Sequence, residues 1–323
     1  MLTGEPMVSI VISNYNGVKS LVRCLKALLG MRYRNFEVVV VDSNSSDGSQ
    51  EMIRARFPEV RLISLSSRVG IGEALNIGVL KSRGEYVVVD LNNDDVVSED
   101  WLSELVGVIE RSENIGIVAG KRYLGDTDKL DSAGGRYAFG LTMAIGHARN
   151  GEDRRYENCY EVDYVPVLLL RKKLFEELGL LDTEYYIYGE DTDFCLRAKL
   201  AGYRILYVPG ARYRHARSST IGEASPRRLY YLFRSRFRLM IKFVPVYKLV
   251  FFLLAHTFIF SIAYSIYYAA YINKEKRNCL EYFAAVKRAL ADTFFNLKWL
   301  IMARYNVQGL RAGSAKTFTI TRL

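Results

Sequence analysis

The chain has 323 residues, of which 50% are hydrophobic and 25% are charged, a balance that permits a packed core and excludes a globally disordered protein. Its four cysteines show no paired spacing, which argues against a disulfide framework or a cysteine-ligated zinc site. The formal net charge of +10 is concentrated at one end, because the whole basic excess lies after residue 222.

Apolar segments of strand length alternate with segments of helix length through the first third of the chain. The predicted strands are residues 8–12, 36–41, 60–65 and 86–89, and the predicted helices are residues 20–29, 49–57, 70–82 and 101–111. Alternation at this spacing indicates an α/β fold with a Rossmann-like, mostly parallel sheet and flanking helices. Polar turns follow Ile12, Val41 and Val89, so they can converge at the carboxyl edge of that sheet, where α/β folds bind ligands.

The most informative stretch is residues 85–95, EYVVVDLNNDD, in which a buried strand leads directly into carboxylates and amides. Such groups repel one another unless a cation or a polar ligand lies among them, and hard oxygen ligands suit Mg²⁺ or Mn²⁺. A metal of this kind usually holds phosphates as well. The simpler interpretation is an Asx-rich turn that caps the helix beginning at Trp101.

The middle of the chain has less regular patterns. Residues 121–161 are rich in Gly, Asp and Arg, and we expect a mobile loop region that covers a site. Strands are predicted over residues 162–170 and 204–208, and short helices over residues 172–178 and 194–201. Glu190-Asp191-Thr192-Asp193 forms a second acidic cluster just before the last of these helices, and His215 follows the last strand.

From residue 223 the chain becomes basic and aromatic, so we divide it into a domain of residues 1–222 and a helical region of residues 223–323. Residues 226–243 mix arginines with large apolar side chains, as in an interfacial amphipathic helix. Residues 249–272 carry no formal charge and are long enough to cross a bilayer, with a re-entrant segment, a hairpin or a soluble helix as alternatives. Residues 279–304 predict another basic surface helix. Basic residues that flank an apolar run favour membrane lipids over nucleic acid as a partner.

Five segments in a fixed order carry a family resemblance: VSIVISNYNG, FEVVVVDSNSSDGS, GIGEALNIGVLKSRGEYVVVDLNNDD, YGEDTDFCLRAKLAGYRILYVPGARYRH and LYYLFRSRFR. Together they span residues 7–243, and in this combination the sequence resembles the inverting family-2 glycosyltransferases, which have a GT-A fold. Within that family it is similar to membrane-associated enzymes that extend lipid-linked or cell-surface glycans, a group that includes rhamnosyl- and mannosyltransferases.

The resemblance implies a binding site for a nucleotide-sugar at the polar turns. Ser13, Tyr15 and Asp42 would contact the nucleoside, with the ring of Tyr15 near the base and Asp42 accepting hydrogen bonds. Arg68 would lie near the pyrophosphate, and Asn93 would contact the nucleotide-sugar. Without the resemblance, the simplest role of these residues is to form turns.

The resemblance also implies a metal centre and a general base. Residues 92–94 correspond to the acidic metal motif of the family, with asparagine in place of the first acid. Asp94 and His215 would bind Mn²⁺ or Mg²⁺, and Asp95 is a further carboxylate that could substitute. Asp191 would take the proton of the acceptor hydroxyl, and the adjacent helix N-terminus would keep it ionised. The alternatives are that Asp191 only caps the helix and that His215 is a structural hydrogen-bonding group.

Two further segments concern the acceptor and the membrane. Pro166-Val167 stands where relatives often carry a pair of small residues, in a strand that tends to line the acceptor. Arg234 and Arg236 would reach the pyrophosphate or a lipid phosphate, or would anchor the chain at the membrane surface.

These features predict transfer of a sugar from a nucleotide-sugar to a polyprenyl- or dolichyl-linked glycan at the cytoplasmic face of the cell membrane. GDP-mannose is the first donor expected, followed by dTDP-rhamnose or a UDP-sugar. Direct transfer to polyprenyl phosphate and a catalytically inactive membrane scaffold are the alternatives. A Rossmann dehydrogenase is set aside, because the turn after the first strand contains only Gly17 and no GxGxxG pattern.

Overall fold

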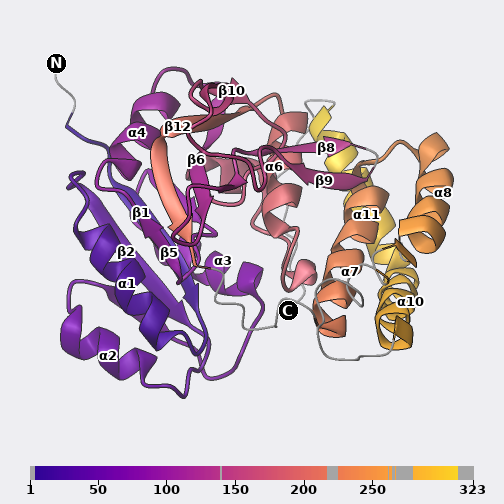
Figure 1. The fold of residues 1–323 in the computed structure, drawn as a ribbon, viewed down its shortest axis with the longest axis horizontal. Helices are drawn as coiled ribbons and strands as arrows, with labels where there is room; N and C mark the ends of the chain where they lie inside the picture. The colour runs from indigo at the N-terminus through magenta and orange to yellow at the C-terminus, as the bar shows by residue number, and fades with distance from the viewer. Residues whose placement is uncertain are drawn as a thin grey trace.

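The computed structural model describes residues 4–138, 140–216, 225–260, 262–263, 266 and 279–311. A twisted β-sheet with helices on both faces forms one part of the molecule, and α7, α8, α10 and α11 gather beside it (Figure 1). The strands are β1 (Val8–Asn14), β2 (Phe36–Asp42), β3 (Arg61–Ser64), β4 (Tyr86–Val89), β5 (Asp95–Val97), β6 (Ile115–Leu124), β7 (Leu130–Ser132), β8 (Gly135–Ala138), β9 (Leu141–Ala144), β10 (Tyr160–Glu161), β11 (Leu168–Arg171) and β12 (Arg204–His215). The α-helices are α1 (Val18–Leu29), α2 (Ser49–Arg56), α3 (Ile71–Lys81), α4 (Trp101–Ile109), α5 (Lys173–Leu178), α6 (Glu190–Leu200), α7 (Pro226–Phe243), α8 (Val246–Ala255), α10 (Cys279–Phe295) and α11 (Leu297–Arg311).

The main sheet has the order β10-β12-β6-β11-β4-β1-β2-β3, with β5 paired to β12 and β7 paired to β6. The pairs β1–β2, β1–β4, β2–β3 and β6–β12 are parallel, as the alternation of strands and helices predicts. β11 is antiparallel to both β4 and β6, so the sheet is mixed. The carboxyl ends of β1 and β4 lie side by side, which brings the turns after Asn14 and Val89 together.

Alternating residues of the central strands pack into two apolar layers. In β1, Val8, Ile10 and Ile12 face the layer that contains α1 and α4, whereas Val11 faces the layer that contains α3 and α6. α3 approaches β1 closely at Gly78, where an added Cβ would lie 2.2 Å from Cγ1 of Val11. Burial on both faces explains why these strands are continuous apolar runs rather than alternating ones.

The expectation of a loop over residues 121–161 is wrong. β6 continues to Leu124, β7 and β10 add to the main sheet, and β8 and β9 form a separate hairpin. Charged residues concealed the strand, because Lys121 and Arg122 are buried in β6. The Nζ of Lys121 donates to the carbonyl of Gly151 at 2.9 Å and to the carboxylate of Glu157, which compensates its burial. The predicted strand over residues 162–170 is likewise shorter, and only Leu168–Arg171 forms β11.

α7 packs against α10 through a separate apolar core, in which Phe233, Phe237, Tyr282 and Val286 are buried, and α11 also contacts α7. α8 continues the chain but buries none of its residues. Of the segment 249–272, residues 261, 264–265 and 267–272 lie outside the described residues. Among the residues that the structure describes, no helix combines the length and the apolar character of a membrane span.

Candidate active site

A cavity of about 490 Å³ opens at the carboxyl ends of β1 and β4. The turn after β4, the loop before α6 and the first turn of α6 line it, and one face of α7 forms a further wall. Seven of the residues predicted for the site meet in this cavity: Ser13, Tyr15, Arg68, Asn93, Asp94, Asp191 and His215.

Asp42, the eighth predicted residue, is fully buried and is not among the residues that line the cavity. Its carboxylate accepts hydrogen bonds from Nδ2 of Asn14 at 2.7 Å, from Oγ of Ser45 at 2.6 Å and from Nε2 of Gln50 at 2.7 Å. The parallel register of β1 and β2 places Asn14 opposite Asp42. In this structure Asp42 therefore holds the end of β1, and its contact with a nucleoside stays a prediction.

The carboxylate–imidazole cluster consists of Asp94, Asp95 and His215, whose ligand atoms all lie within 4.8 Å of one another. The antiparallel pairing of β5 and β12 sets it up, because His215 is the register partner of Asp95. Nδ1 of His215 lies 2.9 Å from Oδ1 of Asp95 and 3.2 Å from Oδ1 of Asp94. Burial alone would lower the pKa of His215, but its hydrogen bonds to the two carboxylates raise it. Two carboxylates and an imidazole form a donor set that suits Mn²⁺ or Mg²⁺.

Arg122 is a buried cation beside this cluster that the sequence pattern did not reveal. Its guanidinium lies 3.7 Å from Asp95 and 3.4 Å from Asp131, and it also lines the cavity. The apolar run of residues 115–119, which ends shortly before Arg122, is the sequence signal that could have identified it. Arg122 offsets part of the negative charge that Asp94 and Asp95 concentrate in a region of low dielectric.

Asp191 lies in the first turn of α6, which begins at Glu190 rather than at the predicted Phe194. Its Oδ1 accepts a hydrogen bond from the backbone N–H of Thr192 at 2.6 Å. Burial raises the pKa of Asp191 to about 6, although this hydrogen bond and the charge of Arg122 oppose the rise. The expected effect of the helix N-terminus is therefore outweighed by desolvation. At neutral pH the group is still mostly ionised and has a pKa suited to accepting a proton.

Two more carboxyl groups, Asp90 and Glu190, which belong to the two acidic stretches of the sequence, line the same cavity. Burial and the charge of Asp191 raise the pKa of Glu190 to about 8, and burial with the charge of Glu190 raises the pKa of Asp90. Glu190 is 3% exposed, and its Oε2 has no hydrogen-bond partner among the described residues. Neighbouring acids that share one desolvated site do not all ionise together.

The side of the cavity next to β1 presents an aromatic ring and amides. The guanidinium of Arg68 lies over the ring of Tyr15 at 4.0 Å from the ring centroid. Nδ2 of Asn93 donates to Oδ1 of Asn14 at 2.7 Å, which ties the turn after β4 to the end of β1. Aromatic rings and planar guanidinium groups are the side chains on which nucleobases stack.

α7 contributes side chains to the cavity from one helical face. Arg228, Leu232, Ser235, Arg236 and Leu239 line it, at the spacing of three and four residues that a helix requires. Arg236 is thus at the cavity, as expected, but Arg234 is not among its lining residues. Nε of Arg234 lies 2.5 Å from the carboxylate of Asp292 in α10, and its Nη1 donates to the carbonyl of Tyr185.

Comparison with known proteins agrees with this arrangement. The family model for glycosyl transferase family 2 matches residues 9–179. The chain is 29% identical over 253 residues to the uncharacterized protein y4gI of Sinorhizobium fredii, covering 73% of this chain and 27% of that protein. It is 25% identical over 225 residues to the glycosyltransferase GlyG of Streptococcus pneumoniae, covering 66% of this chain and 71% of GlyG. The chain therefore spans about a quarter of the first of these relatives.

Solved structures show the same fold. TarS of S. aureus, in complex with UDP-GlcNAc, superposes with a TM-score of 0.59 at 17% identity, over 96% of this chain and 88% of that one. The mannosyltransferase PcManGT of Pyrobaculum calidifontis, in complex with GDP-Man and Mn²⁺, gives a TM-score of 0.54 at 17% identity, over 97% and 88% of the two chains. Because the family model matches more than half of its residues, the chain belongs to glycosyl transferase family 2.

Proposed function

We propose that this chain is a metal-dependent, inverting glycosyltransferase that uses a nucleotide-sugar donor, with GDP-mannose as the first candidate. The observation that carries the proposal is the composition of one cavity. Asp94 and His215 of the carboxylate–imidazole cluster line it, and so does Asp191, whose pKa is about 6. Glycosyl transfer needs one group that binds the anionic leaving group and a second group that takes the proton of the acceptor hydroxyl.

The donor is supported by the cluster and by the stack of Arg68 on Tyr15. PcManGT binds GDP-Man with Mn²⁺ and TarS binds UDP-GlcNAc, and both share this fold. Mn²⁺ or Mg²⁺ held by Asp94, Asp95 and His215 would stabilise the charge of the leaving diphosphate. The ring of Tyr15 would stack on the base, and Arg68 lies where it can contact the base or the diphosphate.

The acceptor hydroxyl reacts in a single displacement. Its oxygen forms a bond to the anomeric carbon as the bond from that carbon to the diphosphate oxygen breaks. Asp191 takes the hydroxyl proton, which requires its ionised form. Glu190, with a pKa of about 8, is largely protonated at neutral pH and can donate a hydrogen bond within the same cavity.

A lipid-linked acceptor and a membrane location are supported by the exposed apolar surface of the C-terminal helices. Tyr247 is 80% exposed, Phe251 70%, Ile259 66% and Phe295 91%. An apolar surface of this kind beside a chain segment with a large basic excess suits an anionic bilayer. We infer that the chain lies at the cytoplasmic face of the cell membrane, where a polyprenyl- or dolichyl-linked glycan can reach the cavity.

Direct transfer to polyprenyl phosphate is the second candidate, because Arg228 and Arg236 of α7 also line the cavity. Guanidinium groups suit a phosphate acceptor. A phosphate oxygen is already ionised and needs no general base. The two candidates therefore differ in how strongly they depend on Asp191.

The test is release of nucleoside diphosphate by the detergent-purified chain from a panel of GDP-, UDP- and dTDP-sugars. Each donor is offered with Mn²⁺, Mg²⁺ or EDTA and with a lipid-linked glycan mixture or polyprenyl phosphate. The proposal predicts turnover of one donor that EDTA and Asp191→Asn both abolish, while Asp128→Asn, at an exposed carboxylate outside the cavity, has no effect. Turnover that survives Asp191→Asn and needs polyprenyl phosphate favours the second candidate. Nucleotide binding without any turnover contradicts both.

The membrane location is tested separately by co-sedimentation with vesicles. We expect binding to vesicles that contain anionic lipid, and Phe251→Glu should weaken it because a charge would enter the apolar surface. Equal binding of the variant and the wild-type chain, or no binding at all, contradicts this location.

A further inference from the structure

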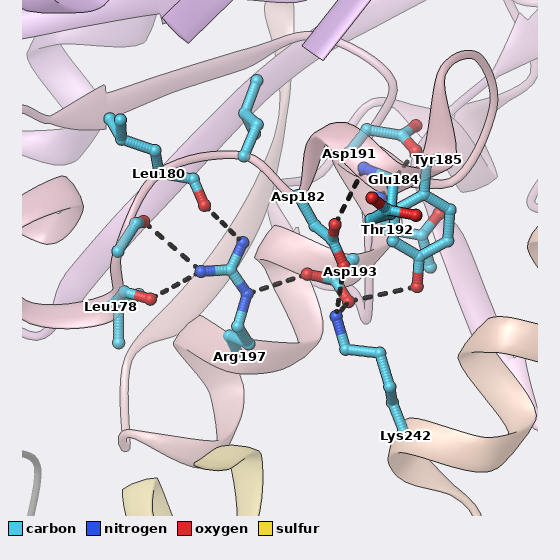
Figure 2. A network of polar contacts seen from close by, with 12 residues as sticks. Leu178, Leu180, Asp182, Glu184, Tyr185, Asp191, Thr192, Asp193, Arg197 and Lys242 are labelled. Atoms are coloured by element: carbon cyan, nitrogen blue, oxygen red, sulfur yellow. Dashed lines mark hydrogen bonds and ion pairs between the residues drawn. The ribbon is translucent and has the colours of Figure 1, made fainter. Parts of the chain in front are cut away.

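A buried ionic network joins α7 to the first turn of α6, which carries Asp191 (Figure 2). Nζ of Lys242 contacts Oδ1 of Asp193 and lies 3.1 Å from Oδ2 of Asp182. Lys242 is 3% exposed and Asp193 is fully buried. A charge pair at this depth is not screened by solvent, so its geometry is held much more firmly than that of a surface ion pair.

Asp193 is the centre of the network. Its Oδ1 also accepts from the hydroxyl of Tyr185 at 3.1 Å, and its Oδ2 accepts from Nε of Arg197 at 2.8 Å. Arg197 in turn donates to the carbonyls of Leu178 and Leu180 (Figure 2). The first turn of α6 is therefore tied to the chain that precedes it on one side and to α7 on the other.

α7 presents its cations to this region at a spacing of four residues, which places Arg234, Arg238 and Lys242 along one face of the helix. Arg234 donates to the carbonyl of Tyr185, and the guanidinium of Arg238 lies 3.5 Å from the carboxylate of Glu184. Three consecutive turns of α7 thus hold the segment that runs from Asp182 into α6. That segment also forms a wall of the cavity, through Tyr186, Ile187, Tyr188 and Gly189.

The backbone of this wall is not in a relaxed conformation. Tyr186 and Tyr188 have φ values of 63° and 66°, in the left-handed region that is unfavourable for residues with a Cβ. Gly189, the residue immediately before α6, has a φ of 101°. A strained turn of this kind keeps one conformation only where the surrounding contacts determine it, and the cations of α7 supply such contacts.

We propose that Lys242 is a positioning residue for the reaction, which acts through Asp193 to fix the first turn of α6 and thereby the place of Asp191 in the cavity. This inference rests on the proposed role of Asp191 as the base. It gives α7 a part in catalysis beyond contact with a membrane. The family model ends at residue 179, so both helices lie outside the matched region.

The test compares Lys242→Met with Lys173→Met. Both substitutions replace a lysine in an ion pair, but the pair that Lys173 of α5 forms with Glu113 is exposed. In Lys242→Met we expect kcat to fall about 10- to 100-fold, as for a misplaced catalytic group, while the KM for the donor stays within about twofold. Lys173→Met should retain the wild-type values. Tyr185→Phe removes the hydroxyl that donates to Asp193 but keeps the aromatic ring and its packing. We expect it to lower kcat by less than Lys242→Met does.

Amide hydrogen exchange gives a measurement that needs no substrate. We expect the peptide that covers the first turn of α6 to exchange at least about tenfold faster in Lys242→Met than in the wild-type chain, with peptides of β1 and β2 unchanged. Unchanged exchange contradicts the positioning role, and so does faster exchange with an unchanged kcat. A wild-type chain that turns over no donor contradicts the proposed function instead, so the two failures are distinguishable.

Discussion

Replacement of Asp191 with asparagine keeps the shape of the side chain and removes its ability to take a proton. Removal of a general base lowers kcat by about 10²- to 10⁴-fold. The structure also predicts the pH dependence of the wild-type chain. With a pKa of about 6, Asp191 is about nine-tenths ionised at pH 7 and about one-tenth at pH 5, so kcat should be about tenfold lower at pH 5. An aspartate with the ordinary pKa of about 3.9 would place the half-maximum near pH 4.

The assay is steady-state release of nucleoside diphosphate across this pH range at two saturating concentrations of Mn²⁺. Protons compete with the metal at Asp94, Asp95 and His215, so a pH effect that arises there moves when the Mn²⁺ concentration is raised. An effect that arises at Asp191 does not move. The reasoning is refuted if Asp191→Asn keeps more than about a tenth of the wild-type kcat, or if the acidic half-maximum lies near pH 4.

Three other substitutions test separate parts of the structure. Asp94→Asn removes a carboxylate from the cluster and should weaken Mn²⁺ binding by at least about tenfold in titration calorimetry, with wild-type affinity as the contrary result. Tyr15→Ala removes the stacking ring and should weaken nucleotide binding by about 1–3 kcal/mol in the same instrument, whereas an unchanged affinity would place the base elsewhere. Gly78→Ala directs a methyl group into Val11 and should lower the free energy of unfolding by about 1–2 kcal/mol in urea denaturation, despite the better helix propensity of alanine. A more stable variant would show that α3 can move away from β1.

The first half of the fold could be predicted from the sequence because its signals are local. Each central strand is a short apolar run and each helix has its own polar face, so β1, β2 and β4 are found within two residues of their predicted ends. The turns that follow them reach one cavity because parallel strands end at one edge. Tyr15, Asn93 and Asp94 are therefore brought together as the sequence indicated.

The parts that were missed depend on pairings between distant segments. β5 has only three residues and shows no periodicity, yet its pairing with β12 places His215 beside Asp95, 120 residues away. The hydrogen bond between Asn14 and Asp42 was likewise not foreseen, because it depends on the register of β1 and β2. Neither register could be derived from the residues of one strand alone.

α7 has three faces that make different contacts. Its mixture of arginines and apolar residues was interpreted as an interfacial helix. In the structure one face carries Phe233 and Phe237 into a core with α10, another lines the cavity with Arg228 and Arg236, and a third holds the segment before α6. The spacing of the arginines by four residues is visible in the sequence and places them on one face of the helix. The groups that they contact lie in another part of the chain, so these contacts could not be predicted from α7 alone.

The measurement that tests the central claim most directly is the anomeric configuration of the product, determined by NMR together with release of the nucleoside diphosphate. The proposed mechanism, in which a metal at the carboxylate–imidazole cluster would bind the leaving diphosphate and Asp191 is the base, is a single displacement, so it predicts a product with the configuration opposite to that of the donor sugar. A product that retains the configuration of the donor would contradict the account, because it requires either two displacements or attack from the face of the leaving group.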